Sequence, residues 1–294
     1  MTKCGVIDVG SNSVRMGIFE KQNSGVVQTE RFRKQVRISE GITKDNLLKE
    51  EPVKRTLEAI QEFKDILDKK GIADVKMVAT EALRRAKNSA TFTDEVKRVF
   101  DIDVEIIDGL KEAHYDVFAA QMTANYNDFY MIDTGGGSVE IALVSGGKIE
   151  KAVCLPLGSV VMTESFRPDE NGTQELESFI KSELEKADII KNNKFPIVAL
   201  GGSNKELAKI DMKICSDNID GHKMSAKSVF AVYNNLKTMT CDERKKVEGF
   251  DEKRADTIVS GLCPIMTLCT LSCSEEICFC TGSVREGVAA ELLL

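Results

Sequence analysis

One short pattern occurs twice in this chain, and it constrains the fold more than any other feature of the sequence. Residues 6–11 read Val-Ile-Asp-Val-Gly-Ser, and residues 131–136 read Met-Ile-Asp-Thr-Gly-Gly. In both copies an apolar run reaches an Asp, passes into a Gly- and Ser-rich turn and returns as a second apolar run. Short apolar runs bounded by turn residues are typical of buried strands. The sequence therefore predicts two domains built from one duplicated design.

The length of the chain agrees with two domains, because 294 residues exceed what one hydrophobic core usually organises. Strand-like and helix-like segments alternate, which predicts an α/β fold. The strands expected at the start of the two copies cover residues 5–9, 14–19 and 25–29, then 129–133, 139–145 and 148–155. We expect domains of 1–118 and 119–294, with a last helix that can pack back on the first domain.

Three of the expected strands end in loops rich in Gly and Ser. Their residues are Gly10, Ser11, Asn12 and Ser13, then Gly135, Gly136, Gly137 and Ser138, and finally Gly202 and Ser203. Glycine lets the backbone approach an anion closely, and successive N–H groups form concave anion-binding nests. One such loop alone is typical of a plain tight turn. Three loops, two of them preceded by Asp in a repeated frame, indicate phosphate binding.

Asp8 and Asp133 occupy the same place in the two copies, at the carboxyl end of a strand beside a phosphate-type loop. In a pseudo-twofold arrangement the two carboxylates would face each other across a cleft. Mg²⁺ takes hard oxygen ligands, often one or two carboxylates together with phosphate oxygens and water. The pair therefore predicts a site for Mg²⁺ or Mn²⁺, although either Asp taken alone would be typical of a turn cap.

Seven segments, in order along the chain, resemble the exopolyphosphatase / guanosine pentaphosphate phosphatase family. They are IDVGSNSVR at 7–15, ATEALRRAKN at 79–88, DTGGGSVE at 133–140, LPLGSV at 155–160, GGS at 201–203, RADTI at 254–258 and REG at 285–287. The resemblance covers essentially the whole chain. It implies two duplicated actin-like (ribonuclease H-like) ATPase-type domains with an interdomain cleft.

The resemblance also implies roles for three charged residues. Glu112 matches the catalytic glutamate of the family and would act as general base on the attacking water. Glu140 matches a second essential carboxylate, which would position the water or bind the metal. Arg84 would neutralise charge on the transferred phosphoryl group. Without the resemblance, Glu112 is a first-turn helix glutamate, favourable against the helix dipole, and Arg84 is equally well a solvated helix charge.

These matches imply an exopolyphosphatase that cleaves terminal phosphoanhydride bonds of inorganic polyphosphate and releases orthophosphate. Guanosine pentaphosphate presents nearly the same bond, so a guanosine pentaphosphate phosphohydrolase is an alternative. The Asp and Gly frame alone would also suit a small-molecule kinase or a non-catalytic nucleotide-binding regulator. The presence of Glu112 and Glu140 favours the hydrolase.

Charge and hydropathy restrict the partners. A formal charge of −7 argues against a nucleic-acid partner. A local basic surface could still bind a polyanion, and Arg31, Arg33, Lys34 and Arg37 form a basic segment that would line such a path or be an ordinary solvated surface. The apolar stretches are shorter than a membrane span, and the first residues lack a signal region. We expect a cytoplasmic protein without a membrane partner, and the resemblance implies a homodimer.

The nine cysteines give no sign of a disulfide framework or a zinc site. Their number is odd, and none is paired in a C-x-x-C pattern. We expect reduced thiols that pack as small apolar side chains.

Overall fold

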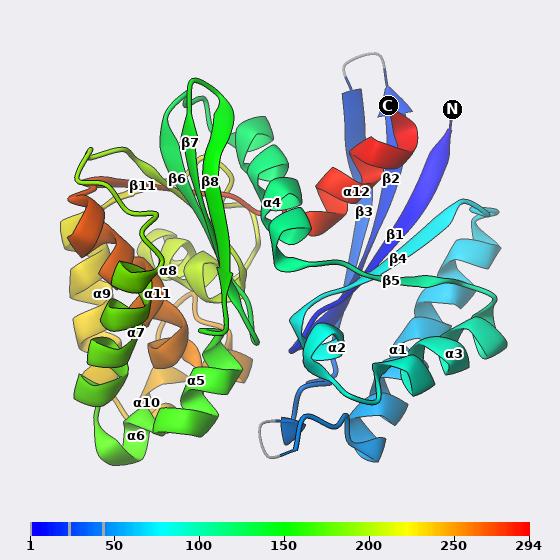
Figure 1. Ribbon diagram of the computed structural model, residues 1–294, viewed down its shortest axis with the longest axis horizontal. Helices are drawn as coiled ribbons and strands as arrows, with labels where there is room; N and C mark the ends of the chain where they lie inside the picture. Colours follow the sequence, from blue (N-terminus) through cyan, green and yellow to red (C-terminus); the bar gives the residue numbers. More distant parts are fainter. Residues whose placement is uncertain (1, 23–24, 43–44) are drawn as a thin grey trace. The chain divides into compact units, whose positions relative to one another are not determined.

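The structure is a computed structural model of the chain, and it describes residues 2–22, 25–42 and 45–294. The chain divides into two compact units (Figure 1). Unit 1 comprises Met1–Tyr115 and Val284–Leu294, and unit 2 comprises Asp116–Ser283. The division falls within helix α4 (Gly109–Thr123), the helix that also contains the boundary expected after residue 118. The closing helix α12 (Val284–Leu293) belongs to unit 1.

Unit 1 is built on a five-stranded sheet in the order β3-β2-β1-β4-β5. Its strands are β1 (Lys3–Val9), β2 (Ser13–Gln22), β3 (Gly25–Gln35), β4 (Val75–Ala79) and β5 (Val104–Ile106). β1, β2 and β3 form an antiparallel meander, whereas β1, β4 and β5 run parallel. Since β1 lies at the centre of the sheet, its side chains are buried on both faces, and the strand reads as a nearly continuous apolar run.

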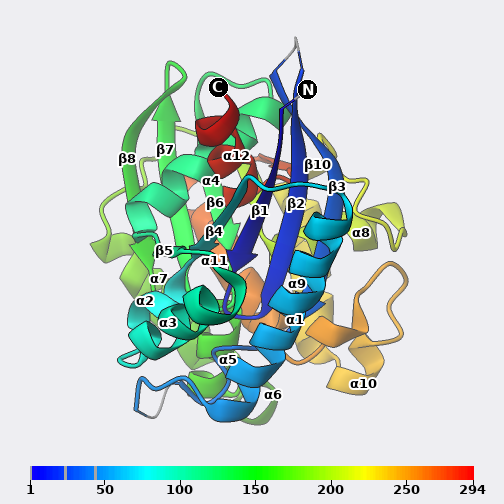
Figure 2. The same cartoon turned by 90° about the vertical axis from the view of Figure 1, so that its right-hand side faces the viewer.

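Helices cover both faces of this sheet (Figure 2). The side chains of Ile7, Val9 and Met16 share one cluster with α1 (Glu50–Lys69), α2 (Glu81–Arg85) and α3 (Ser89–Phe100). On the other face Val6 and Phe19 pack with apolar residues of α12. Every third or fourth residue of α1 is apolar on the side that meets the sheet, as the helical period requires.

Unit 2 has a six-stranded sheet in the order β10-β11-β9-β6-β7-β8. Its strands are β6 (Phe129–Thr134), β7 (Val139–Ser145), β8 (Lys148–Leu155), β9 (Ile197–Leu200), β10 (Lys223–Ser225) and β11 (Glu276–Phe279). Its helices are α5 (Ser159–Phe166), α6 (Pro168–Asn171), α7 (Gln174–Lys186), α8 (Gly202–Met212), α9 (Ala226–Thr238), α10 (Cys241–Arg244), the 3₁₀ turn η2 (Glu252–Arg254) and α11 (Ile258–Ser272). The apolar helix α11 is buried almost throughout and contacts α5, α7, α8 and α9.

The predicted duplication is confirmed by the strand order. In each unit the first three strands form an antiparallel meander, and the first strand then pairs in parallel with the fourth strand, which follows one described α-helix in unit 1 and three in unit 2. β6, β7, β8 and β9 therefore repeat β1, β2, β3 and β4. The expected α/β fold with two related sheets is correct.

One strand is longer than its sequence pattern indicated. The strand expected at 25–29 continues as β3 to Gln35, so it includes the basic residues Arg31 and Arg33. Their alternation with Glu30, Phe32 and Lys34 shows little of the apolar periodicity that marks a half-buried strand.

Within residues 2–22, 25–42 and 45–294, no helix combines the length and apolar character needed to cross a membrane.

Candidate functional site

In the Gly- and Ser-rich loop of unit 1, residues 10–13, backbone carbonyl groups accept hydrogen bonds from within the loop and from neighbouring segments. The Gly10 N–H donates to the Ser13 carbonyl at 3.2 Å, which closes the turn. The Ser11 carbonyl accepts from the N–H and hydroxyl of Ser39 at 3.3 and 3.2 Å. The Asn12 carbonyl accepts from the N–H groups of residues 36 and 37 at 3.1 and 3.0 Å. Because a trans peptide points its C=O and N–H in opposite directions, the N–H groups of Asn12 and Ser13 point away from these partners.

The loop of unit 2 repeats this geometry. The Gly135 N–H donates to the Ser138 carbonyl at 3.0 Å, as Gly10 does to Ser13. The carbonyls of Gly135, Gly136 and Gly137 accept from N–H groups of residues 158–161, at the start of α5, over 2.9–3.3 Å. These bonds satisfy helix N-terminal donors that would otherwise lack partners. The N–H groups of residues 136–138 therefore point to the opposite side, as in an anion-binding nest.

Asp8, near the end of β1, is a buried carboxylate, and burial of its charge costs free energy. Only 7% of it is exposed, and its Oδ1 is buried without a hydrogen-bond partner among the residues that the structure describes. Burial raises the pKa of its carboxyl above the usual value, a shift that Arg15 and Arg285 oppose and Glu286 reinforces. A buried oxygen of this kind is suited to accept from a ligand or to bind a cation.

Cross-strand pairing places residues of opposite charge next to the aspartates of the two units. In unit 1 Asp8 lies opposite Arg15, which lies opposite Arg33. In unit 2 Asp133 lies opposite Glu140, which lies opposite Cys154. Directly opposed residues share a face of the sheet, with Cβ atoms about 4.5–5.5 Å apart. The same duplicated position thus carries a cation in unit 1 and a second carboxylate in unit 2.

The carboxylates of Asp133 and Glu140 fit a magnesium ion that also binds phosphate. Glu140 is 1% exposed, and one of its oxygens accepts a hydrogen bond from the Cys154 thiol at 3.0 Å. Among the described residues no group of three or more His, Cys, Asp or Glu side chains is arranged to hold a metal. Two carboxylates are nevertheless the usual protein share of a Mg²⁺ site, since phosphate oxygens and water complete the shell.

The third loop is built around close backbone approaches. Gly201 has φ +86°, and a Cβ atom there would lie 2.4 Å from Asp133 Oδ1. A Cβ atom on Gly202 would lie 1.9 Å from the Arg254 guanidinium, and Ser203 packs against Gly261 of α11. The loop therefore places Gly201 beside the carboxylate of Asp133 and Gly202 beside a buried cation.

Arg84 and Glu112 meet in unit 1. Arg84 donates from Nη1 to Glu112 Oε2 at 3.0 Å and to the carbonyl of residue 107 at 2.8 Å. Its Nε and Nη2 both donate to Glu81 Oε2, at 3.1 and 2.9 Å. The ammonium of Lys111 instead binds Glu105 at 2.8 Å. Glu112 is thus bound by Arg84, the residue that the resemblance assigns to the same reaction.

The structure brings the predicted residues together in two groups. Unit 1 holds Asp8, residues 10–13, Arg84 and Glu112, and unit 2 holds Asp133, residues 135–138, Glu140, Gly202 and Ser203. The predicted pairing of Asp8 with Asp133 joins residues of different units, and it stays a prediction.

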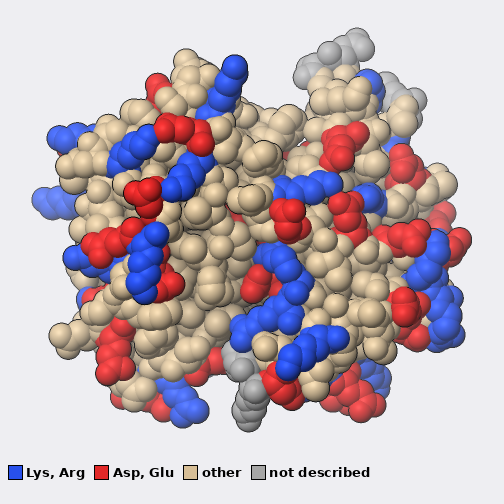
Figure 3. All heavy atoms as spheres, in the orientation of Figure 1, with Lys and Arg blue, Asp and Glu red and all other residues tan. Residues whose placement is uncertain are grey.

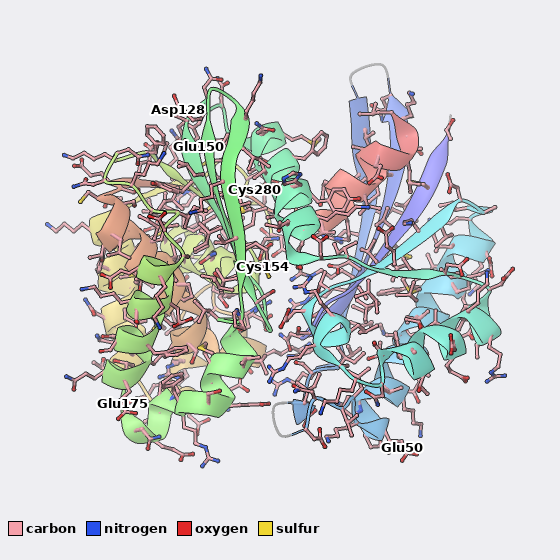
Figure 4. All side chains as sticks on the ribbon, viewed as in Figure 1. Glu50, Asp128, Glu150, Cys154, Glu175 and Cys280 are labelled. Atoms are coloured by element: carbon pink, nitrogen blue, oxygen red, sulfur yellow. The ribbon has the colours of Figure 1, made fainter. Side chains whose placement is uncertain are left out.

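Four neighbours of these groups were not predicted as site residues. They are Arg15 and Arg285 beside Asp8, Arg254 beside Gly202, and Cys154, which Figure 4 shows on β8. The three arginines lie in segments that carry the family resemblance. The sequence therefore marked these segments, but it did not indicate what the arginines do. Cys154 has no such signal, because its contact depends on the register of β7 and β8.

Comparison with known proteins identifies the family. Residues 18–294 match the family model described as the Ppx/GppA phosphatase family. The chain belongs to this family. Ppx/GppA phosphatases are hydrolases, so hydrolysis of phosphate compounds is the class of chemistry that membership supports.

Individual relatives agree with this assignment. A bifunctional 3-dehydroquinate synthase/phosphatase of Fusobacterium nucleatum is 28% identical over an alignment 279 residues long, which covers 87% of this chain and 41% of that protein. The chain thus spans less than half the length of this curated relative. The crystal structure of the Aquifex aeolicus member of the Ppx/GppA family has 26% identity and a TM-score of 0.84, covering 99% of this chain and 97% of that one. An exopolyphosphatase from Cytophaga hutchinsonii shares the fold, with 24% identity and a TM-score of 0.84, covering 99% and 98% of the two chains.

Proposed function

We propose that this protein is an exopolyphosphatase that uses Mg²⁺ or Mn²⁺ to release orthophosphate from the end of inorganic polyphosphate. The observation that carries the proposal is the opposed pair Asp133 and Glu140, at the end of β6 and the start of β7, beside a loop whose N–H groups form an anion nest. A metal at the carboxylates and a phosphate at the loop would then lie next to each other. That arrangement is what phosphoryl transfer to water requires.

The remaining predicted residues receive roles by their chemistry. Glu112 would accept the proton of the attacking water, and Arg84 would stabilise charge on the phosphoryl oxygens. The bond between Arg84 and Glu112 orients the carboxylate before substrate binds. Asp8 would be a further metal ligand, as its buried Oδ1 can accept a cation or a metal-bound water. When bound, the metal would polarise the phosphate and neutralise its negative charge.

The test is Mg²⁺-dependent phosphate release by the purified protein, compared on polyphosphate, on guanosine pentaphosphate and on ATP with a panel of sugars. We expect release from polyphosphate, none in the presence of a chelator, and no phosphorylation of sugars. Preferential hydrolysis of guanosine pentaphosphate would instead support the alternative substrate. Release from neither phosphoanhydride with either metal would contradict the proposal.

Glu112→Gln tests the assignment of the base. The amide keeps the size of the side chain and can still accept from Arg84, but it cannot take a proton. Loss of a general base typically costs about 10²–10⁴-fold in rate. Glu105→Gln is the matched control, because Glu105 is a neighbouring glutamate of unit 1 that binds Lys76 and Lys111 instead. Full activity of the Glu112 variant would show that another group is the base.

A homodimer and a cytoplasmic location stay predictions from the sequence.

A further inference from the structure

β3 lies at the edge of the unit 1 sheet (Figure 2), and its two faces carry different side chains. On the side of α1, Phe32 packs near Phe63, and the charged residues are neutralised by salt bridges. Glu30 pairs with Lys70 at 2.8 Å, and Lys34 pairs with Glu62 at 2.6 Å. These contacts are a sufficient structural explanation for the polar residues of this face.

The opposite face of β3 carries Arg31 and Arg33, and their bonding leads toward the phosphate-type loop. Arg33 lies opposite Arg15, and its Nε donates to the Ser13 hydroxyl at 3.2 Å. Arg31 lies opposite Gly17 and donates from Nε and Nη2 to Gln28 Oε1 at 3.0 and 2.9 Å. The two arginines thus follow one another along the strand, and Arg33 is the one that contacts the loop.

The surroundings of this row carry charges of both signs. Arg15 and Arg31 both act on Arg285, whose pKa falls to about 10 chiefly because the side chain is buried. Asp8 and Glu286 are the acidic groups that act on the same guanidinium from nearby. Figure 3 shows acidic and basic side chains interspersed over the face of the molecule that it presents. The four arginines named here outnumber the two acidic groups, so this part of the sheet is locally basic within a chain of total charge −7.

We propose that Arg33 and Arg31 form a subsite for the inner phosphates of a linear polyphosphate that binds at residues 10–13. The inference deepens the proposed function and rests on it. Residues two apart on a strand are about 6.6–6.8 Å apart. Arg31 therefore meets a phosphate farther from this loop than Arg33 does. A linear polyphosphate offers a charge at each of these positions, whereas guanosine pentaphosphate interrupts its phosphates with a neutral sugar.

The experiment measures binding rather than turnover, so that it is independent of catalysis. Tripolyphosphate and long-chain polyphosphate are titrated into the protein in the presence of a chelator, which keeps both ligands intact. The variants are Arg31→Ala, Arg33→Ala and the charge-retaining Arg31→Lys. Lys34→Ala is the matched control, since it removes a cation from the same strand on the other face.

Arg31→Ala is expected to weaken binding of long-chain polyphosphate about tenfold, the effect of losing one charge-assisted contact, and to leave tripolyphosphate unchanged. Arg33→Ala should weaken both ligands, and Arg31→Lys should retain most of the affinity. The affinity of Arg31→Ala for the long chain should also depend less steeply on salt, because one fewer counterion is displaced.

Equal effects of Arg31→Ala on the short and the long ligand would overturn the subsite, as would an effect of Lys34→Ala as large as that of Arg31→Ala. Wild-type protein that binds the two ligands equally well would overturn it too. None of these results bears on whether the enzyme cleaves phosphoanhydrides. The phosphate-release assay with wild-type protein decides that separately.

Discussion

Gly201 shows how a single backbone position shapes the site of unit 2. Its φ of +86° lies in the left-handed region, where a side chain is strained, and a Cβ atom would also meet Asp133 Oδ1 at 2.4 Å and the Thr134 carbonyl oxygen at 2.6 Å. Two separate requirements, one conformational and one steric, therefore select glycine here.

We predict that Gly201→Ala lowers the free energy of unfolding by about 2–3 kcal/mol, because overpacking adds to the backbone strain. Gly147→Ala is the control: its φ is also positive, at +74°, but nothing lies within 4 Å of its Cβ position. The control should cost only about 1 kcal/mol. Denaturant unfolding measures both, and equal losses would show that the contact with Asp133 has no energetic weight.

Asp8 is expected to cost stability at neutral pH. Its folded-state pKa lies above the ordinary 3.8, so the folded protein binds the proton more tightly than the unfolded chain. Stability therefore falls as pH rises from 3.8 toward the raised folded-state pKa, and Asp8→Asn removes this fall. We predict that the variant unfolds at a higher temperature than wild type at pH 7, that the gap vanishes below pH 3.8, and that phosphate release is lost. A variant less stable than wild type at pH 7 would contradict the sign.

At the scale of side chains, the sequence indicated candidate site residues but not the residues that contact them. The repeated frame located Asp8 and Asp133, and the resemblance located Glu112 and Arg84. The neighbours that tune them were not predicted, since Arg285 reaches Asp8 from the far end of the chain. No local periodicity records a contact of that sequence separation.

Among the elements, α12 has the clearest consequence for stability. Val288 is 2% exposed and packs with Val6 and Phe19 on the face of the unit 1 sheet that α12 covers. This helix joins residues near the end of the chain to β1, β2 and β3. The core of unit 1 is therefore completed only when the last residues are in place.

Val288→Asp should destabilise unit 1 by about 3 kcal/mol or more, because it buries an unpaired charge. Leu294→Asp places the same charge on a residue that is 72% exposed, and it should change stability by less than about 0.5 kcal/mol. Calorimetry compares the two variants, and hydrogen exchange would locate the loss in β1 and β2. Similar melting temperatures for both variants would argue against a structural role for α12.

Elements were predictable from sequence where their pattern was regular. The strands of the duplicated frame are apolar and bounded by Gly-rich turns, so they were recognised. β3 was predicted too short because charged side chains occupy both of its faces beyond residue 29. The charged residues of β3 form ion pairs toward α1 on one face and a row of arginines on the other. These are tertiary features, which strand propensities do not describe.

For the molecule as a whole, the internal duplication predicted two related sheets, and the strand orders confirm it. What the duplication could not predict is where its copies differ. Asp8 and Asp133 are equivalent, yet their cross-strand partners are Arg15 and Glu140. At the position next to each aspartate the charge is therefore reversed, from a cation in unit 1 to a carboxylate in unit 2.

That reversal has a consequence for how such a molecule can evolve. Two copies with identical rows would both attract anions or both attract cations, and neither copy alone would offer the combination. In this chain the first row places cations beside its aspartate, and the second row places a further carboxylate there. Replacing either half by a copy of the other would therefore remove one of these two surroundings, although the repeated backbone would be kept.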